Sequence, residues 1–195
     1  MTIAAQTALL VVDVQAGFDD PVWGPRNNPA CDDNIRSLLD AFVRTGRPVV
    51  YVRHDSREPN SPLAPAAPGN ALKAYLGAFQ PSLLVTKSVN SSFHGSPDLD
   101  MWLRHGEVSG IVVTGITTNH CCETTARMAG NLGYRVLFSA HGLPKRVIER
   151  GDLSLLLGAP AGVAVDAVAG AQQLEPDRRV FFGSQRKRAP EVVER

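Results

Sequence analysis

The sequence lacks any long apolar run, which argues against a helix that crosses a membrane. No segment approaches the ~20 consecutive apolar residues that such a helix needs, and the apolar run near the start, residues 8–12, is followed at once by Asp13. The first residues also lack the basic segment that opens a secretory signal peptide. We therefore expect a cytoplasmic protein that has no membrane partner.

Cysteine is scarce as well, and neither sign of charge is in excess. The chain has three cysteines, an odd number without the spacing of a disulfide framework, as is typical of proteins in a reducing cytosol. The formal net charge is +1, so nothing indicates a nucleic-acid partner, whose phosphates favour strongly basic proteins. A chain of 195 residues is long enough to bury a core without disulfides or metals, and we expect one domain over residues 1–195.

What the sequence does contain is a series of short apolar segments that alternate with amphipathic ones. The apolar segments predict strands buried on both faces, at residues 7–14, 48–54, 82–87, 108–115 and 134–140. The amphipathic segments predict helices, at residues 35–46 after an N-cap at Asn34, at 97–106 and at 119–131. This alternation is typical of an α/β fold: a three-layer α/β/α, Rossmann-like domain with a central, mostly parallel sheet.

Polar side chains stand at the carboxyl ends of these strands, where open α/β sheets bind their ligands. Asp13 ends the first predicted strand, His54 the second and Lys87 the third. A buried carboxylate is costly unless it is paired, and Lys87 is the obvious partner for Asp13. A loop-capping aspartate and a solvated lysine would explain each residue alone, but their convergence favours an active site.

Two adjacent cysteines, Cys121 and Cys122, fall where the fourth strand passes into a helix. In the first turn of a helix the dipole and free N–H groups favour a thiolate, and a nearby lysine would lower the thiol pKa further. A carboxylate that accepts the proton completes the requirements for a nucleophile. Adjacent residues are rotated by about 100° around a helix, so we assign Cys121 as the nucleophile and Cys122 as a buried apolar side chain.

Metal binding is the competing interpretation of the cysteine pair. Adjacent cysteines chelate zinc poorly, because structural zinc sites use spaced pairs. The five histidines show no metal-binding spacing either. We therefore expect neither a metal nor another cofactor.

Three segments in this order, ALLVVDVQAGF, VTKSVNSSF and VVTGITTNHCCETTARMAGNLGYRV, resemble the isochorismatase-like cysteine hydrolases. That superfamily includes nicotinamidases, N-carbamoylsarcosine amidases, maleamate and ureidoacrylate amidohydrolases, streptothricin hydrolases and isochorismatases. The resemblance covers residues 7–138 and implies a catalytic triad of Asp13, Lys87 and Cys121. It also implies a cytoplasmic homodimer or homotetramer.

The resemblance further implies a cis peptide bond between Ile116 and Thr117 and an oxyanion hole formed by the backbone N–H groups of Thr117 and Cys121. The expected reaction is hydrolysis of a C–N bond in a small amide, ureide or lactam through a thioester. Two alternatives stay open: an isochorismatase-type vinyl-ether hydrolase that does not need the thiol, and a non-catalytic relative that binds a small molecule.

The chain departs from the nicotinamidases in the segment VRHDSREPNSP at residues 52–62. Nicotinamidases hold a metal there with an Asp-x-His pair and a further histidine, whereas this segment keeps only His54. The segment is similar to the metal-free branch of the superfamily. Pocket-lining residues are expected in the long loop at 55–69. Weaker candidates for lining the substrate pocket are Gln15, Phe18, Trp23, His54, Phe93 and His120.

A second departure begins at about residue 140. Superfamily members carry Asp-Ala after the fifth strand, where this chain has Ala140 and His141. A sixth strand is expected at residues 162–168, and the rest of this segment shows little helical periodicity.

Overall fold

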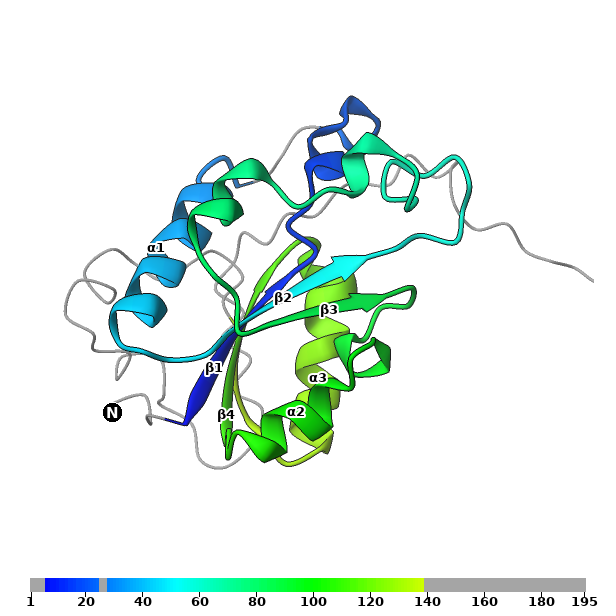
Figure 1. The fold of residues 1–195 in the computed structure, drawn as a ribbon. Coiled ribbons are helices and arrows are strands. Elements are labelled where there is room, and N and C mark those ends of the chain that lie inside the picture. Colours follow the sequence, from blue (N-terminus) through cyan, green and yellow to red (C-terminus); the bar gives the residue numbers. More distant parts are fainter. Residues whose placement is uncertain (1–5, 25–27, 139–195) are drawn as a thin grey trace, which may run out of the picture.

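The computed structural model describes residues 6–24 and 28–138. Five strands form one sheet in which all neighbours run parallel. Their order is β3-β2-β1-β4-β5 (Figure 1). The strands are β1 (Thr7–Val12), β2 (Val49–His54), β3 (Leu83–Lys87), β4 (Gly110–Gly115) and β5 (Arg135–Phe138). The predicted α/β class with a central parallel sheet is confirmed.

Among the described residues, three α-helices connect and cover these strands: α1 (Cys31–Arg44), α2 (Leu99–His105) and α3 (Glu123–Asn131). Single helical turns fill several connections. They are the 3-10 turns Ala16–Asp19, Pro21–Trp23, Pro68–Asn70, Ala74–Ala78 and Ser92–His94, and the π turn Thr118–Cys122. No helix in the described ranges is both long and apolar enough to span a membrane.

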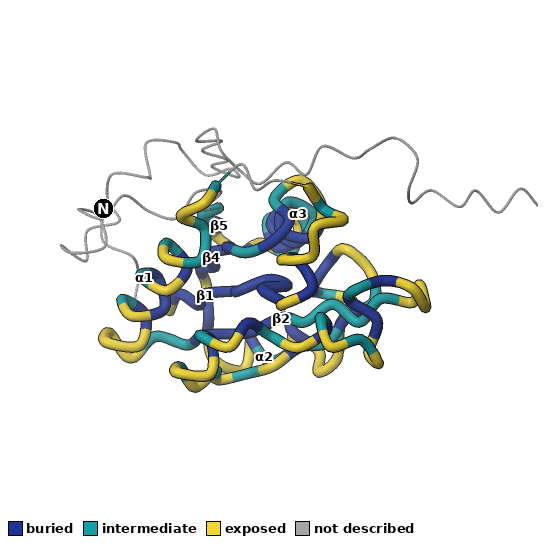
Figure 2. The backbone as a smooth tube through the Cα atoms, turned by 90° about the horizontal axis from the view of Figure 1, so that it is seen from above, coloured by how far each residue is buried: buried dark blue, intermediate teal, exposed yellow. Residues whose placement is uncertain are grey.

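The helices lie on both faces of the sheet because successive side chains of a strand point to opposite sides. Leu9 and Val11 of β1 pack with α1 on one face, and Leu10 and Val12 pack with α2 and α3 on the other. Figure 2 shows the central strands buried between these layers. Every residue of β1 is buried. Burial of each leucine or valine side chain stabilises the fold by about 1.5–3 kcal/mol.

The predicted starts of two helices are wrong. Helix α1 begins at Cys31 and contains Asn34 within its first turns, so Asn34 is not the cap. The chain turns earlier because the Asn28 side chain accepts a hydrogen bond from the Ala30 N–H at 3.1 Å, an Asx turn that leads into the helix. Helix α3 begins only at Glu123, because the π turn precedes it.

Strand β1 is shorter than predicted, since it ends at Val12 and Asp13 has a φ of 52°, outside the extended region. The expected sixth strand at 162–168 and the departure after residue 140 lie outside the described residues, as does part of the expected single domain.

Candidate active site

The site lies at the topological switch point of the sheet. Connections from β1 run outward to β2 and β3 on one side, whereas β4 and β5 lie on the other. The carboxyl ends of β1 and β4 therefore border a crevice, the usual place for a ligand in such folds. The Asp13 N–H donates to Val52 O at 2.9 Å and the Ile116 N–H donates to Val12 O at 2.9 Å, which fixes both strand ends.

Asp13 and Lys87 form a buried ion pair there. Lys87 Nζ donates to Asp13 Oδ2 at 2.6 Å, and both side chains are 0% exposed. Burial is the largest single effect and alone would lower the pKa of Lys87, but Asp13 and Cys121 together outweigh it and the pKa is raised. Asp13 Oδ1 is buried and has no hydrogen-bond partner among the described residues. One carboxylate oxygen is thus held by the lysine, and the other is available to a proton.

Cys121 approaches this pair from the π turn after β4. Its Sγ, an oxygen of Asp13 and a ring nitrogen of His54 all lie within 4.8 Å of one another. The thiol donates to Asn90 Oδ1 at 3.8 Å. The structure thus places the three predicted triad residues and His54 close together.

The protonation state of Cys121 differs from the expected activated thiolate. Burial raises the pKa of the Cys121 thiol to about 12, the Asp13 carboxylate raises it too, and Lys87 opposes both effects. Cys121 is 8% exposed and lies within a π turn instead of opening an α-helix. The free protein therefore holds a neutral thiol at neutral pH.

The turn between β4 and Cys121 has an unusual backbone. The peptide bond between Ile116 and Thr117 is cis. The Thr117 carbonyl accepts from the N–H groups of His120 and Cys122 at 3.4 and 3.3 Å. The Thr117 N–H itself donates to no acceptor within residues 6–24 and 28–138, so it is available to a bound molecule.

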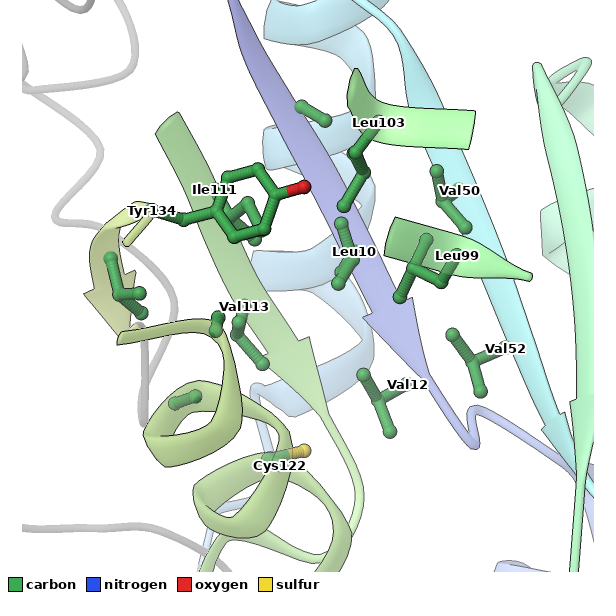
Figure 3. Close-up of a cluster of buried hydrophobic side chains, with 14 of the residues drawn as sticks. Leu10, Val12, Val50, Val52, Leu99, Leu103, Ile111, Val113, Cys122 and Tyr134 are labelled. Carbon is green, nitrogen blue, oxygen red and sulfur yellow. The ribbon is translucent and has the colours of Figure 1, made fainter. Parts of the chain in front are cut away.

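Cys122 has a different environment from its neighbour. It is buried in the core cluster with Val12 and Val113, and Figure 3 shows its side chain among these apolar groups. Burial raises its pKa well above the ordinary thiol value. Cys122 therefore packs as a small apolar residue, as predicted.

His54 and Gln15 form a second layer beside the ion pair. His54 Nδ1 lies 3.1 Å from Lys87 Nζ. The buried Gln15 amide holds the His54 backbone in both directions, since its Nε2 donates to His54 O at 3.0 Å and its Oε1 accepts from His54 N at 2.8 Å. Gln15 Nε2 also donates to Asn70 O at 2.9 Å. The Gln15 amide, predicted as a pocket residue, therefore fastens β2 and the following loop.

The other predicted pocket residues lie in different surroundings. The rings of Phe18 and Trp23 lie 5.4 Å apart, and both pack in a small cluster that contains Ile116. Phe93 instead stacks on Tyr134 at 6.1 Å and packs against the main core. His120 is exposed. The structure thus brings Phe18 and Trp23 towards Ile116 at the end of β4, whereas Phe93 packs against the core cluster that contains Cys121 and Cys122.

Three side chains near the ion pair could in principle bind a metal ion, but their surroundings disfavour one. Within the described ranges, a single group of at least three candidate ligands is found, at Asp13, His54 and Cys121. The Lys87 ammonium already contacts Asp13 and His54, so a divalent ion would face a positive charge at close range. These side chains therefore do not fit a divalent metal ion.

Two features near Cys121 were not predicted from the sequence. Asn90 lies three residues after Lys87, inside a segment that carries the family resemblance. Its position in the loop after a strand end could therefore have indicated a site residue. The buried hydroxyls of Ser92 and Thr125 are 3.0 Å apart, and they join this loop to α3. No sequence pattern connects two such residues.

Known proteins resemble this chain in sequence. Residues 7–149 match the model of the isochorismatase domain. The isochorismatase family protein YrdC of Bacillus subtilis is 42% identical over 127 residues, which are 65% of this chain and 67% of that protein. Nicotinamidase 3 of Arabidopsis thaliana is 30% identical over 145 residues, 68% of this chain and 70% of the relative.

Two further similarities concern a named hydrolase and a solved structure. Streptothricin hydrolase of Streptomyces noursei is 34% identical over 133 residues, and the match spans 67% of this chain but 51% of that enzyme. A crystal structure from Chromobacterium violaceum, described as a putative hydrolase of the isochorismatase family, has a TM-score of 0.65 and 32% identity. That match covers 80% of this chain and 87% of the other.

Proposed function

This chain belongs to the isochorismatase family, and on that premise we propose that it is a cysteine-dependent amidohydrolase of small molecules. Its substrate would be an amide, ureide or lactam, cleaved at the C–N bond through a thioester on Cys121. Relatives named as nicotinamidase and streptothricin hydrolase support hydrolysis in general. The resemblance to nicotinamidases does not extend to their metal ligands after β2.

The observation that carries the proposal is the geometry of one buried carboxylate. Asp13 Oδ2 is held by Lys87 at 2.6 Å, whereas Asp13 Oδ1 has no partner among the described residues. Cys121 Sγ is within 4.8 Å of the same carboxylate. A buried acceptor without a donor is costly, and a proton from the nearby thiol removes that cost.

The charges of the site explain how a thiol with a high pKa can react. A pKa of about 12 describes a thiol that loses its proton to water while Asp13 keeps its charge. Transfer of the proton to Asp13 instead removes the carboxylate charge that disfavours the thiolate. The sum of charges over Asp13, Lys87 and Cys121 is zero before and after the transfer. We place this transfer at the moment when a substrate carbonyl accepts the sulfur.

The remaining steps balance without another reactant except water. Cys121 Sγ bonds to the carbonyl carbon, and the oxyanion is held by the Thr117 and Cys121 N–H groups. The C–N bond breaks as protonated Asp13 returns its proton to the leaving nitrogen. Water then attacks the thioester, Asp13 accepts a proton from that water, and the proton passes to the departing sulfur. The products are an acid and an amine or ammonia.

Three variants and one panel of substrates test the proposal. Ammonia or amine release is measured with nicotinamide, carbamoyl amino acids, maleamate, ureidoacrylate and lactam antibiotics. Cys121→Ala and Cys121→Ser should lose turnover, and Cys122→Ala should keep it, since Cys122 points into the core. Mass spectrometry after a substrate pulse should find an acyl adduct on the Cys121 peptide. A dead Cys122 variant with an active Cys121 variant would reverse the assignment.

One observation favours a second reaction, vinyl-ether hydrolysis of the isochorismatase type. A neutral thiol in the free protein is no obstacle to a reaction that does not use the sulfur as a nucleophile. That reaction predicts turnover without an adduct and without sensitivity to thiol alkylation. Saturable binding of a panel compound without turnover would favour the non-catalytic alternative.

A further inference from the structure

We propose that His54 is a positioning residue that accepts a hydrogen bond from Lys87 through Nδ1 and keeps the ammonium in place while the proton moves between Cys121 and Asp13. The inference rests on the proposed function, since it names a further member of that site. It assigns His54 the neutral tautomer with its hydrogen on Nε2.

The sheet places the two residues side by side. His54 and Lys87 are the last residues of β2 and β3, and they are paired in register across the two parallel strands. Partners in register send their side chains to the same face. The resulting distance between Lys87 Nζ and His54 Nδ1 is 3.1 Å, which is within hydrogen-bonding range.

The tautomer follows from the chemistry of the partners. A lysine ammonium has three donors and no acceptor, so His54 Nδ1 must supply the lone pair and cannot carry a hydrogen. The neutral ring then carries its hydrogen on Nε2. Burial lowers the pKa of His54 and so does Lys87, while Asp13 and Asp55 act in the opposite direction without reversing the shift. The ring is therefore neutral at neutral pH.

Hydrogen bonds also hold the backbone of His54 in position. Gln15 bonds both the N–H and the carbonyl of His54, and the Asn70 amide donates to the same carbonyl at 3.1 Å. Of the charged groups around the ring, Asp55 is engaged by Arg53 at 2.8 Å and Lys87 by Asp13. Nδ1 is thus a fixed acceptor directed at the ammonium.

A fixed acceptor matters because the other partner of Lys87 changes during the reaction. When Asp13 takes the thiol proton, its oxygen becomes a weaker acceptor for the ammonium, since hydrogen bonds to charged groups are the stronger ones. The bond to His54 does not change at that step. It holds Lys87 in place, and the third ammonium hydrogen can serve the sulfur as charge develops there.

Protonation of His54 has a definite sign. A hydrogen on Nδ1 would point at the ammonium of Lys87, so the positioning bond would be replaced by repulsion. Activity should therefore fall as the pH drops below the ordinary histidine pKa of about 6.5. The groups that face the ring are Lys87 from β3, Asp13 after β1, Asp55 after β2 and Cys121 from the π turn. Asp55 has its pKa lowered despite burial, because Arg53 and Asn70 bond it.

The test compares two amides that imitate different halves of the ring. In His54→Asn the side-chain oxygen can stand near Nδ1 and accept from Lys87, whereas in His54→Gln the amide reaches the position of Nε2. We expect His54→Asn to stay within about tenfold of the parent kcat and His54→Gln to lose about 100-fold, with KM changed less than kcat in both. The acid limb of kcat should disappear in His54→Asn, because asparagine does not titrate. Equal losses in both variants, a loss in KM alone or an acid limb kept by His54→Asn would overturn the proposal.

A spectroscopic measurement on the unmodified protein does not depend on turnover. The ¹⁵N chemical shifts of His54 should show an unprotonated Nδ1 and a protonated Nε2 between pH 7 and 9. A hydrogen on Nδ1 in that range would refute the positioning role even if the protein is an active amidohydrolase. The reverse result, the Nε2–H tautomer without an adduct on Cys121, would support the His54 contact and reject the proposed function. Thermal unfolding of both variants confirms that each is folded.

Discussion

At the scale of single residues, Asp13 combines two costs that a structural residue would avoid. Its carboxylate is fully buried, and its φ of 52° lies in the left-handed region, which few residues other than glycine adopt. Strained residues persist where the surroundings enforce them, and they gather at functional sites. The Asp13 backbone is held to β2 by its N–H, and its side chain is held by Lys87. These two contacts hold the carboxylate, with its unpartnered Oδ1, at the carboxyl end of β1.

The charge of Asp13 predicts an unusual pair of effects in one variant. Asp13→Asn removes the base and should abolish turnover, yet it should make Cys121 more reactive towards iodoacetamide at pH 7.5. Burial and the carboxylate both raise the pKa of the thiol while Lys87 lowers it. The variant keeps the burial and the lysine but removes the carboxylate, so alkylation should accelerate by about tenfold or more.

The matched control removes an exposed carboxylate of the same charge, in Asp40→Asn on α1. That variant should change neither rate. Because an unpaired buried charge costs about 3–5 kcal/mol, the Asp13 variant is first tested for folding by circular dichroism. Slower alkylation in folded Asp13→Asn would contradict the electrostatic account of the thiol.

Asn90 predicts a milder effect. Its amide oxygen accepts from the Cys121 thiol at 3.8 Å and the residue is exposed, so it borders the crevice without supporting the core. Asn90→Ala should lower kcat/KM by about tenfold, in line with the loss of one modest hydrogen bond of about 1.4 kcal/mol, and leave the unfolding temperature unchanged.

A neighbouring exposed residue provides the control, since Val89→Ala changes the same loop without touching the sulfur. Asn90→Asp should slow alkylation of Cys121 at pH 8, because a new negative charge beside a thiol raises its pKa. Unchanged kcat/KM in Asn90→Ala would remove Asn90 from the site.

At the scale of elements, the carboxyl ends of β1 and β4 lie so close together that there is no room for a side chain at Gly115. Gly115 has a φ of 141°, and a Cβ atom there would lie 1.9 Å from Val12 O. The pairing of Val12 with Gly115 therefore depends on glycine. This close approach brings the turn that carries Cys121 next to Asp13.

Gly115→Ala should therefore be strongly destabilising. The clash is with backbone, and the left-handed φ adds strain, so we expect a loss on the order of 2–4 kcal/mol in the free energy of unfolding. Gly77→Ala is the control, because a Cβ atom at Gly77 meets nothing within 4 Å. Urea titration of both variants measures the difference, and equal stability would show that the strand ends can separate.

At the scale of the whole molecule, the outline of the fold could be predicted from the sequence, but the pKa values of the buried site residues could not. The strands are apolar runs, and the end of each run indicated where Asp13, His54 and Lys87 would meet. The start of α1 was missed because an Asx turn at Asn28 is a local event with no apolar period. The pKa of Cys121 was missed because it depends on burial and on the position of a carboxylate 108 residues earlier in the chain.

The buried titratable groups predict alkaline sensitivity of the whole fold. Burial raises the pKa of Tyr51 to about 12 and that of Cys121 also to about 12, and the pKa of Lys87 is raised through Asp13. A group whose pKa is higher in the folded state keeps its stabilising effect below its unfolded pKa and loses it as the pH rises towards the folded value. Stability should therefore decline from about pH 9 upward, through the unfolded pKa values of cysteine, tyrosine and lysine.

Urea unfolding at pH 8 and pH 10.5 measures this decline. Tyr51→Phe removes one of these groups, together with its hydrogen bond to Leu76 O at 3.1 Å. That variant should be less stable at pH 8 but should lose less on going to pH 10.5. A parent protein equally stable at both values would contradict the argument. The homodimer or homotetramer expected from the family resemblance stays a prediction.

The buried pair of Asp13 and Lys87 has one more consequence, for how the reaction responds to the buffer. Ions screen charges that water reaches, over about 10 Å at 0.1 M salt, but neither of these side chains is exposed. The proton transfer proposed for the site also moves charge without changing its sum. With an uncharged substrate, kcat should therefore be the same in dilute buffer and in molar sodium chloride. A marked salt dependence of kcat would mean that solvent ions reach the centre during turnover.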